Sequence, residues 1–435
     1  MYPRRVDVIT MGCSKNLVDS ERLIRMLNDA GYEVRHNPER IDAEIAIVNT
    51  CGFIGDAKEE SVNAILECCN AKTNGDVERV FVMGCLSQRY KDDLMTEIPE
   101  VDRWYGKYDW IKLTKDLVAD HPGAATWERV ITTPRHHAYI KISEGCNRFC
   151  AFCAIPLITG RHHSRSIEDI TDEVTSLVSK GVTEFNIIAQ DLSSYGIDIY
   201  GKKKLAELID KLAQIDGVKR IRLHYAYPTD FPYDILPVMN RHSNVCKYLD
   251  IALQHISDNV LSNMRRHITA QQTRELLTRI REEVPGIHIR TTLMVGFPGE
   301  GEKEFKELLD FVKEARFERM GAFAYCEEDD TYAAKHLEDS ITDEVKQKRL
   351  DELMSLQESI AQEHNESKIG KVLEVVIDSY DDKYYVGRTE YDSPEVDPEV
   401  LISRDENTPE LMRGEYYKVR ITSALPFELF GEVIF

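Results

Sequence analysis

Short β-rich runs alternate with helical patterns along most of this chain, and this alternation restricts its possible folds more than any other feature. Within residues 4–120, the runs VDVITMGC, DAEIAIVNTC and RVFVMGC are each followed by a helical pattern. Strands that alternate with helices are typical of parallel βαβ units. We therefore predict a doubly wound α/β domain over residues 4–120.

Three cysteines stand at the ends of these three predicted strands, and each has a glycine beside it. They are Cys13, Cys51 and Cys85. In a flavodoxin-like strand order, 2-1-3-4-5, the strands they follow would be neighbours, and ligands bind outside the carboxyl ends of such strands. The three thiols would then meet at one place. The alternative is that they are small apolar residues buried in the core.

The middle of the chain has the same alternation on a larger scale. Periodicity is lost over residues 121–135, which contain two prolines and are expected to be a linker. From residue 138 to about 365 we count six strand-then-helix units. Six units predict a partial parallel (β/α)6 barrel with its chemistry at the carboxyl ends of the strands, since a closed barrel would need two more.

The C-terminal part has a different pattern. A helix is predicted over about 343–368, with a glycine stop at Gly370, and only short strands follow it. Such a series is typical of a small five-stranded, OB-like barrel. The predicted domains are thus residues 4–120, 132–367 and 368–435.

Length and composition agree with several ordinary globular domains. The chain has 435 residues, of which 42% are hydrophobic and 30% are charged. These values exclude disordered, collagen-like and disulfide-rich miniprotein classes. There is no run of 18 apolar residues, and the segment MYPRRVDVITMG leads directly into a predicted strand. We therefore expect a cytoplasmic protein that does not enter a membrane.

The charge distribution points to a basic partner. The formal net charge is −21, which disfavours indiscriminate binding to nucleic acid. Acidic residues are especially frequent after residue 370, and the segment EYDSPEVDPE contains five acids and no base. A face of this kind should attract a basic protein and repel phosphate. The candidate docking residues are Asp392, Glu395, Asp397 and Glu399.

A second group of cysteines has a spacing that is rare by chance. Cys146, Cys150 and Cys153 lie in the loop after the first strand of the predicted barrel. In a reducing compartment such a set indicates metal or redox chemistry rather than disulfides. Three thiolates suit an iron–sulfur cluster with one open iron. The alternative is structural zinc completed by His162 or His163.

The remaining four cysteines are interpreted as packing residues. They are Cys68, Cys69, Cys246 and Cys326. Cys68 and Cys69 lie within a predicted helix, away from any strand end, and free cysteines are commonly buried. We interpret Cys246 and Cys326 in the same way.

Polar and glycine residues at other strand ends are candidates for a cofactor pocket. They include Gln190 and Asp191, Gln254 and His255, and the turn GFPGE at 296–300. Arg161 or Arg165 could bind a carboxylate with two hydrogen bonds. From this group we predict cofactor contacts from Gln190, Arg165, Gly296 and Gly299. Ordinary turn chemistry and exposed loop arginines are the alternatives.

The segment CNRFCAFC, in the first loop of a six-unit barrel, resembles the radical S-adenosylmethionine superfamily. Together with the N-terminal cysteines and the terminal barrel, it resembles the methylthiotransferases, whose last domain is a TRAM domain. Four segments are similar to the RimO-type branch, which modifies ribosomal protein twelve of the small subunit: GCSKNLVDSE, KISEGCNRFC, LQHISDNVLSNMRR and GRTEYDSPEVD. The resemblance covers nearly the whole chain. One segment, AYCEEDDTYA at 324–333, departs from the expected YSxxxGT-like pattern.

The resemblance implies two 4Fe–4S clusters and two molecules of S-adenosylmethionine per turnover. Cys146, Cys150 and Cys153 match the ligands of the radical cluster, and the N-terminal trio matches those of an auxiliary cluster that holds or supplies sulfur. One S-adenosylmethionine would methylate this sulfur. The other would give the radical that takes hydrogen from the β-carbon of an aspartate. An external electron donor and a sulfur donor are also implied.

Two other functions remain open from the sequence. A tRNA adenosine methylthiotransferase would carry the same clusters, but the acidic C-terminal part and the KNLVDSE segment favour a protein substrate and make tRNA a less suitable partner. A non-catalytic iron–sulfur carrier or zinc-stabilised scaffold would need four ligands at each site.

Overall fold

The structure is a computed structural model that describes residues 4–52, 55–117, 128–406 and 408–434. The chain divides into two compact units. Unit 1 contains Met1–Thr133, Tyr139–Asn147 and Cys153–His163, and unit 2 contains Pro134–Ala138, Arg148–Phe152 and Ser164–Phe435. The predicted linker, 121–135, lies partly outside the described residues. Within those residues, every helix is too short or too polar to cross a membrane.

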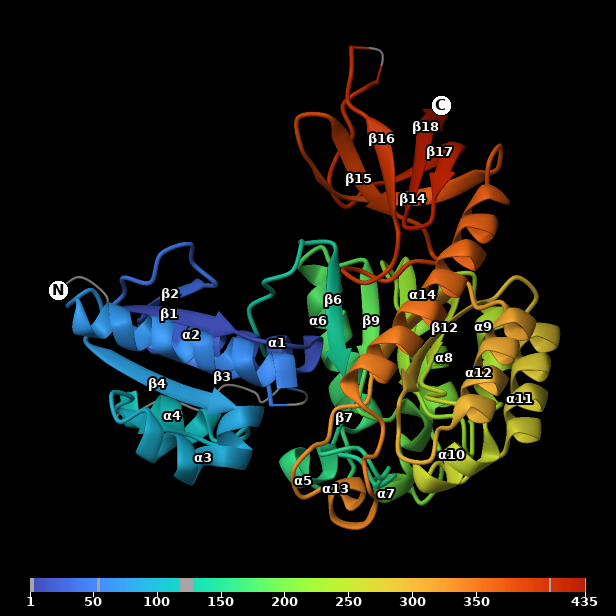
Figure 1. Cartoon of the computed structure of the whole chain (residues 1–435). Coiled ribbons are helices and arrows are strands. Elements are labelled where there is room, and N and C mark those ends of the chain that lie inside the picture. The colour runs from blue at the N-terminus through green and yellow to red at the C-terminus, as the bar shows by residue number, and fades with distance from the viewer. Residues whose placement is uncertain (1–3, 53–54, 118–127, 407, 435) are drawn as a thin grey trace. The chain divides into compact units, whose positions relative to one another are not determined.

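The sheet of unit 1 has the strand order β2-β1-β3-β4-β5, and its strand pairs are parallel. This confirms the order 2-1-3-4-5 predicted from the sequence, and Figure 1 labels β1, β2, β3 and β4. The strands are β1 (Arg5–Thr10), β2 (Glu33–His36), β3 (Ile45–Thr50), β4 (Arg79–Gly84) and β5 (Arg103–Trp104).

Helices cover both faces of this sheet, as the doubly wound fold requires. The helices are α1 (Ser14–Asp29), α2 (Gly55–Thr73), α3 (Cys85–Glu97) and α4 (Trp110–Leu117). Leu23 of α1 and Leu113 of α4 pack with Val8 in one apolar core. Ile65 of α2 and Leu86 of α3 share the other core with strand residues that point the opposite way. Because side chains alternate along a strand, the central strands β3 and β4 supply both cores.

The large sheet has six strands in the order β13-β12-β11-β10-β9-β6. Neighbours from β9 to β13 are parallel, and the order follows the chain. This confirms the six predicted strands and the open, partial barrel. They are β6 (His137–Lys141), β9 (Glu184–Ile188), β10 (Arg220–Ala226), β11 (Val245–Ile251), β12 (His288–Val295) and β13 (Arg319–Ala324).

The helices of unit 2 follow the strands in turn, and neighbours such as α6 and α8 or α8 and α9 contact one another. They are α6 (Ile167–Ser179), α7 (Ile197–Tyr200), α8 (Leu205–Ala213), α9 (Ile235–Arg241), α10 (Asp258–Asn263), α11 (Ala270–Glu283), α12 (Glu302–Ala315), α13 (Tyr332–His336) and α14 (Asp343–Glu366). Three short elements lie next to the loop of the second cysteine group in the chain. They are β7 (Ser143–Glu144) before the loop, and α5 (Ile155–Thr159) and β8 (His163–Ser164) after it.

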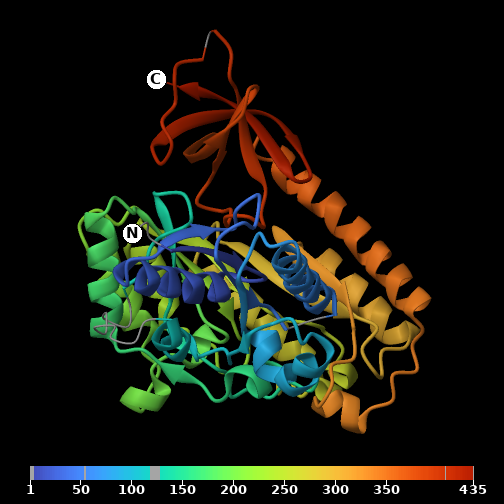
Figure 2. The same cartoon turned by 90° about the vertical axis from the view of Figure 1, so that its left-hand side faces the viewer.

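The chain after α14 forms a closed barrel with the strand order β14-β15-β16-β18-β17. It begins just after Gly370, whose φ of +82° suits a glycine, and Figure 2 shows it beyond the end of α14. The five predicted strands are confirmed as β14 (Val372–Tyr380), β15 (Tyr384–Arg388), β16 (Glu399–Ser403), β17 (Tyr416–Leu425) and β18 (Glu428–Ile434). Inward residues such as Val375, Val400 and Val419 fill the barrel.

Buried ion pairs join this barrel to the large sheet. Glu184, at the start of β9, pairs with Arg222 of β10 and with Arg388 of β15. Arg388 Nε also lies 2.6 Å from an oxygen of Asp378, and all four side chains are largely buried. A second pair joins Arg319 of β13 to Asp392 at 2.6 Å. Because removing one partner leaves a buried charge, these pairs fix the barrel on the amino-terminal ends of the strands.

His137, at the start of β6, should make the stability of the protein pH-dependent. Burial lowers its pKa to about 3, and the positive charge of Arg388 adds to this effect. The folded state therefore keeps this ring neutral, whereas the unfolded chain takes up a proton below about pH 6.5. Stability should thus fall as the pH drops from about 6.5 towards 3, by up to about 1.4 kcal/mol per pH unit.

The test compares thermal unfolding of the apo protein and of His137→Gln over this pH range. The variant should lose less stability on acidification than the unsubstituted protein, whatever its stability at neutral pH. His336→Gln is the matched control, since His336 is exposed. Equal acid slopes for the unsubstituted protein and His137→Gln would contradict the prediction.

Candidate functional site

The three N-terminal cysteines meet at the carboxyl edge of the unit 1 sheet. The strands end level, because Thr10 pairs with Asn49 across β1 and β3, and Thr50 pairs with Gly84 across β3 and β4. Cys13 directly precedes α1, Cys51 follows β3, and Cys85 begins α3. Burial is the main reason that the pKa of Cys85 is raised to about 12; Lys107 opposes this rise, and the nearby Cys13 and Cys51 add to it. The parallel fold thus brings together three thiols that are far apart in sequence.

Glycines allow the chain to pass closely between these cysteines. Gly12 has a φ of +82°, and a Cβ there would lie 2.6 Å from the Sγ of Cys51. A Cβ at Gly84, where φ is +106°, would lie 2.4 Å from the carbonyl oxygen of Thr50. Both positions therefore require glycine, for the backbone conformation and for the space.

Asn16 connects the loops that carry these cysteines, and it was not among the residues predicted from the sequence. Its side-chain amide donates to the carbonyl oxygens of Met11, at 3.1 Å, and Thr50, at 2.8 Å. Its Oδ1 accepts from the Sγ of Cys85 at 3.5 Å. The sequence did contain one signal: Asn16, Asp19 and Ser20 recur at helical spacing and so lie on one face of α1. The structure shows that this polar face is buried.

A buried group of charges lies beside this edge within unit 1. Asp19 accepts from Lys107 Nζ at 3.0 Å and also from Lys141. Burial raises the pKa of Asp19, but the two ammonium groups outweigh this and hold it well below its usual range. Desolvation likewise raises the pKa of Cys13, while Lys15 and Lys107 contribute to lowering it overall. Positive charge and the start of a helix both favour a thiolate here.

The second cysteine group lies in the loop between β7 and α5. Cys146 and Cys153 belong to unit 1 and are partly buried, and Cys150 belongs to unit 2 and is buried. Gly145 precedes them with a φ of +74°, and a Cβ there would lie 2.1 Å from the carbonyl oxygen of Arg161. The loop can therefore begin only with a glycine, which closes it against the chain after α5.

Cys150 has two polar neighbours in unit 2. Arg266 donates from Nη1 to its Sγ at 3.3 Å, and the hydroxyl of Tyr227 lies 3.5 Å from the same atom. Asp191, one of the strand-end residues singled out in the sequence, is buried and accepts from Arg148 Nε at 2.7 Å. Asp191 therefore holds an arginine of the cysteine loop instead of lining an open pocket.

Other strand-end residues are engaged within the chain. Glu300 of GFPGE is buried, accepts from the backbone N–H of Gly296, and lies against His255 Nε2 at 3.1 Å and Arg349 Nη1 at 2.9 Å. Protein packing also explains the glycines of this turn, because Lys346 and Asn263 fill the space beside Gly296 and Gly299.

Gln254 stands out among these residues. Its φ of +70° is strained for a non-glycine residue, and its buried Oε1 has no hydrogen-bond partner within the described ranges.

Arg165 and Gln190 have different surroundings. Arg165 does pair with a carboxylate, but that carboxylate is Glu173, at 2.6 Å. Gln190 follows β9 and is partly exposed. Cofactor contacts by these two residues and by Gly296 and Gly299 remain predictions.

Three of the four remaining cysteines are packing residues, and one is not. Cys68, Cys69 and Cys246 are buried, which confirms the interpretation. Burial raises the pKa of Cys68 to about 12 and that of Cys69 to about 11. The packing role predicted for Cys326 is wrong, because this residue is exposed after β13.

The predicted docking face needs a correction. Asp392 is buried and pairs with Arg319, and the carboxylate of Asp397 accepts from the Tyr248 hydroxyl at 2.8 Å and lies 3.4 Å from Arg290. These two acids hold the barrel on the sheet and are not available to a partner. Glu395 and Glu399 are exposed.

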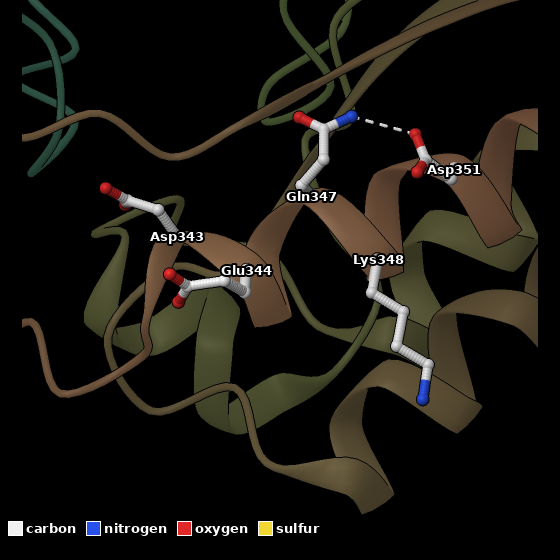
Figure 3. A pocket seen from close by; sticks show the side chains of 5 residues that line it. All are labelled: Asp343, Glu344, Gln347, Lys348 and Asp351. Carbon is white, nitrogen blue, oxygen red and sulfur yellow. Dashed lines mark hydrogen bonds between the residues drawn. The ribbon is translucent and has the colours of Figure 1, made fainter.

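A surface hollow at the start of α14 is not a candidate site. Figure 3 shows the residues that line it, and all of them come from one helix: Asp343, Glu344, Gln347, Lys348 and Asp351. Gln347 donates to Asp351 at 2.8 Å. The hollow contains no thiol, imidazole or buried polar group that could carry chemistry.

The donor sets of both cysteine groups consist of thiols. In the described part of the chain, no three His, Cys, Asp or Glu side chains are already placed as ligands of one metal ion, and this applies to both cysteine groups. Soft thiolates, glycine-lined loops and nearby positive charge suit an anionic iron–sulfur cluster.

Three family descriptions match successive parts of the chain. Residues 5–106 match "Uncharacterized protein family UPF0004", residues 140–312 match the radical SAM superfamily, and residues 369–434 match the TRAM domain. The radical SAM superfamily implies a 4Fe–4S cluster and S-adenosylmethionine.

Curated relatives match along the full length. The ribosomal protein uS12 methylthiotransferase RimO of Phocaeicola vulgatus is 58% identical over 434 residues, which cover 100% of both chains. The proteins of the same name from Bacteroides thetaiotaomicron and Porphyromonas gingivalis are 57% and 58% identical, with 99% and 100% of their chains covered.

Solved structures share the fold at low sequence identity. The radical S-adenosylmethionine methyltransferase TsrM from Kitasatospora setae has a TM-score of 0.54 and 17% identity, over 74% of this chain and 75% of its own. The cobalamin-dependent radical enzyme OxsB has a TM-score of 0.52 and 14% identity, over 82% and 56%. With the full-length relatives, the three matched domains and the thiol-bearing strand ends, this chain belongs to the ribosomal protein uS12 methylthiotransferase family of radical SAM enzymes.

Proposed function

We propose that this protein methylthiolates the β-carbon of an aspartate in ribosomal protein uS12, using two 4Fe–4S clusters and two molecules of S-adenosylmethionine per turnover. The observation that carries the proposal is the presence of two cysteine trios, one at a sheet edge and one in a loop, in a chain similar throughout to uS12 methylthiotransferases. An unactivated C–H bond offers no acidic proton to a general base, so this substrate position needs radical chemistry.

Cys146, Cys150 and Cys153 would hold the radical cluster, and three protein ligands leave one iron for S-adenosylmethionine. When bound and reduced by one electron, these groups supply a 5′-deoxyadenosyl radical that takes hydrogen from the substrate. Cys13, Cys51 and Cys85 would hold the auxiliary cluster, where the inserted sulfur is carried and methylated. An external one-electron donor and a sulfur donor complete the reaction, which we expect in the cytoplasm because the substrate is a ribosomal protein.

The chain's own residues prepare these two places. Asn16 holds the loops of the auxiliary site in register, and the buried Lys107 and Lys141 lie beside it. Gly12 keeps a side chain out of the space beside the Cys51 thiol, and Gly84 lets the chain before Cys85 pass against Thr50. At the other group, Arg266 and Tyr227 surround Cys150 and exclude water from its sulfur.

The decisive experiment is mass spectrometry of the product. The reconstituted protein is incubated anaerobically with S-adenosylmethionine, a reductant, sulfide, and either uS12 or tRNA. We expect one methylthio group in place of hydrogen on an aspartate of uS12, and no cleavage of S-adenosylmethionine by Cys150→Ala. Modification of tRNA alone would favour a tRNA methylthiotransferase. If neither the unsubstituted protein nor Cys150→Ala cleaves S-adenosylmethionine, the protein would be an electron carrier or scaffold.

Gly12→Ala should weaken the auxiliary cluster selectively. The added Cβ would lie 2.6 Å from the Sγ of Cys51, which must move to accommodate it. We expect the iron bound after reconstitution to fall by about half, because one of two equal clusters is lost. Gly31→Ala is the matched control, since Gly31 has a φ of +85° and a Cβ there would have no neighbouring atom within 4 Å. If both variants bind equal iron, the auxiliary site does not depend on this contact.

Glu395 and Glu399 should help to bind the basic substrate, since both remain exposed on the barrel side of unit 2. The double substitution Glu395→Lys and Glu399→Lys should lower kcat/KM for uS12 several-fold at low ionic strength, mainly through KM, and the effect should shrink with added salt. Glu282→Lys together with Glu358→Lys, at exposed sites on α11 and α14, makes the same change in net charge and is the control. An equal loss in the control would rule out a local docking role.

A further inference from the structure

An aromatic ring between two arginines lies directly beside Cys150. The guanidinium of Arg148 stands 4.2 Å from the centre of the Tyr227 ring, and that of Arg266 stands 4.1 Å from it. Cation–π contacts of this kind are favourable, and more so where water is excluded. Arg266 and Tyr227 are both buried, so one positive charge and one phenol lie against the sulfur in a place of low dielectric, and Arg148 adds a second positive charge at the ring.

Two polar groups of this arrangement point at the sulfur itself. Arg266 Nη1 donates to Sγ at 3.3 Å, and the Tyr227 hydroxyl lies 3.5 Å from it, within the range for hydrogen bonds to sulfur. A thiolate carrying negative charge would accept from both donors. Hydrogen bonds that involve an ionised group are stronger than those between neutral groups.

The arrangement is held rigidly from several sides. Arg266 also donates to the carbonyl oxygen of Ala252, and its own carbonyl oxygen lies 3.3 Å from the Tyr227 hydroxyl, whose one hydrogen turns to the sulfur when Cys150 is a thiolate. The backbone N–H of Tyr227 donates to the Ser193 hydroxyl at 2.8 Å, and that hydroxyl donates to the Tyr227 carbonyl at 2.9 Å. Asp191 fixes Arg148 through Nε. The donors therefore reach the sulfur without a further cost in side-chain entropy.

We infer that Arg266 and Tyr227 are positioning residues that set the midpoint potential of the cluster ligated by Cys150, making it easier to reduce. The inference rests on the proposed function, which places a 4Fe–4S cluster on this thiolate. Reduction adds one electron from an external donor, changes no covalent bond, and makes the cluster more negative by one charge. A buried cation and hydrogen bonds to a ligand sulfur stabilise the more negative state, and they raise the potential.

The potential is measured on the full-length chain with Cys13→Ala, Cys51→Ala and Cys85→Ala, so that only one cluster contributes to the signal. This triple variant is reconstituted and titrated by electron paramagnetic resonance. Arg266→Gln should lower the equilibrium constant for reduction about tenfold, which is about 59 mV for a one-electron couple. Tyr227→Phe should give a smaller shift in the same direction, and Arg266→Lys should retain most of the original potential.

Arg279→Gln is the matched control, because Arg279 also lies over a tyrosine ring, 3.8 Å from the centre of Tyr233, but on exposed α11. It should leave the potential unchanged. If Arg266→Gln fails to retain iron, Tyr227→Phe decides the question, since it removes only a hydroxyl. Normal iron content with unshifted potentials would overturn the inference alone. A triple variant that binds no iron at all would overturn the proposed function, and the inference with it.

Discussion

Parallel pairing is the constraint on which the rest of this structure depends. In a parallel sheet all carboxyl ends lie at one edge, so each return of the chain brings new side chains to the same place. In unit 1 this edge collects Cys13, Cys51 and Cys85, and the first turns of α1 and α3 begin there. The large sheet uses the same rule, since Asp191 and Gln254 each follow one of its strands at that edge. The topology therefore places the sites, and the sequence needs only to supply cysteine or polar side chains at these strand ends.

Buried ion pairs are a second feature that recurs in both units. Asp19 lies between two lysines in unit 1, and Glu184 lies between two arginines in unit 2. Such pairs add little net stability, because desolvation opposes their attraction, but the loss of one partner costs about 3–5 kcal/mol.

The sequence was sufficient for the fold and for the positions of the thiols. The strands and helices follow from hydrophobic period and turn residues, which are local signals, and the strand order follows from the flavodoxin-like topology that this alternation indicates. The partners of the thiols could not be found in this way. Asn16, Lys107 and Arg266 are ordinary polar residues in the sequence, and only the tertiary fold places them against Cys85 or Cys150. The same limit explains Asp392 and Asp397, because composition does not show which carboxylates face arginines of the same chain.

The ion pairs of Glu184, Arg319 and Asp392 also bear on how this architecture can change by recombination. A terminal barrel that is joined by one helix looks like a module that could be exchanged between relatives. Here, however, β9, β10 and β13 each present a buried charged residue to it. A donor barrel that lacks a counterpart to Asp392 would take from Arg319 its carboxylate partner, and one that lacks a counterpart to Arg388 would leave Glu184 with Arg222 alone. The barrel and the amino-terminal ends of the sheet must therefore be inherited, or engineered, as one set.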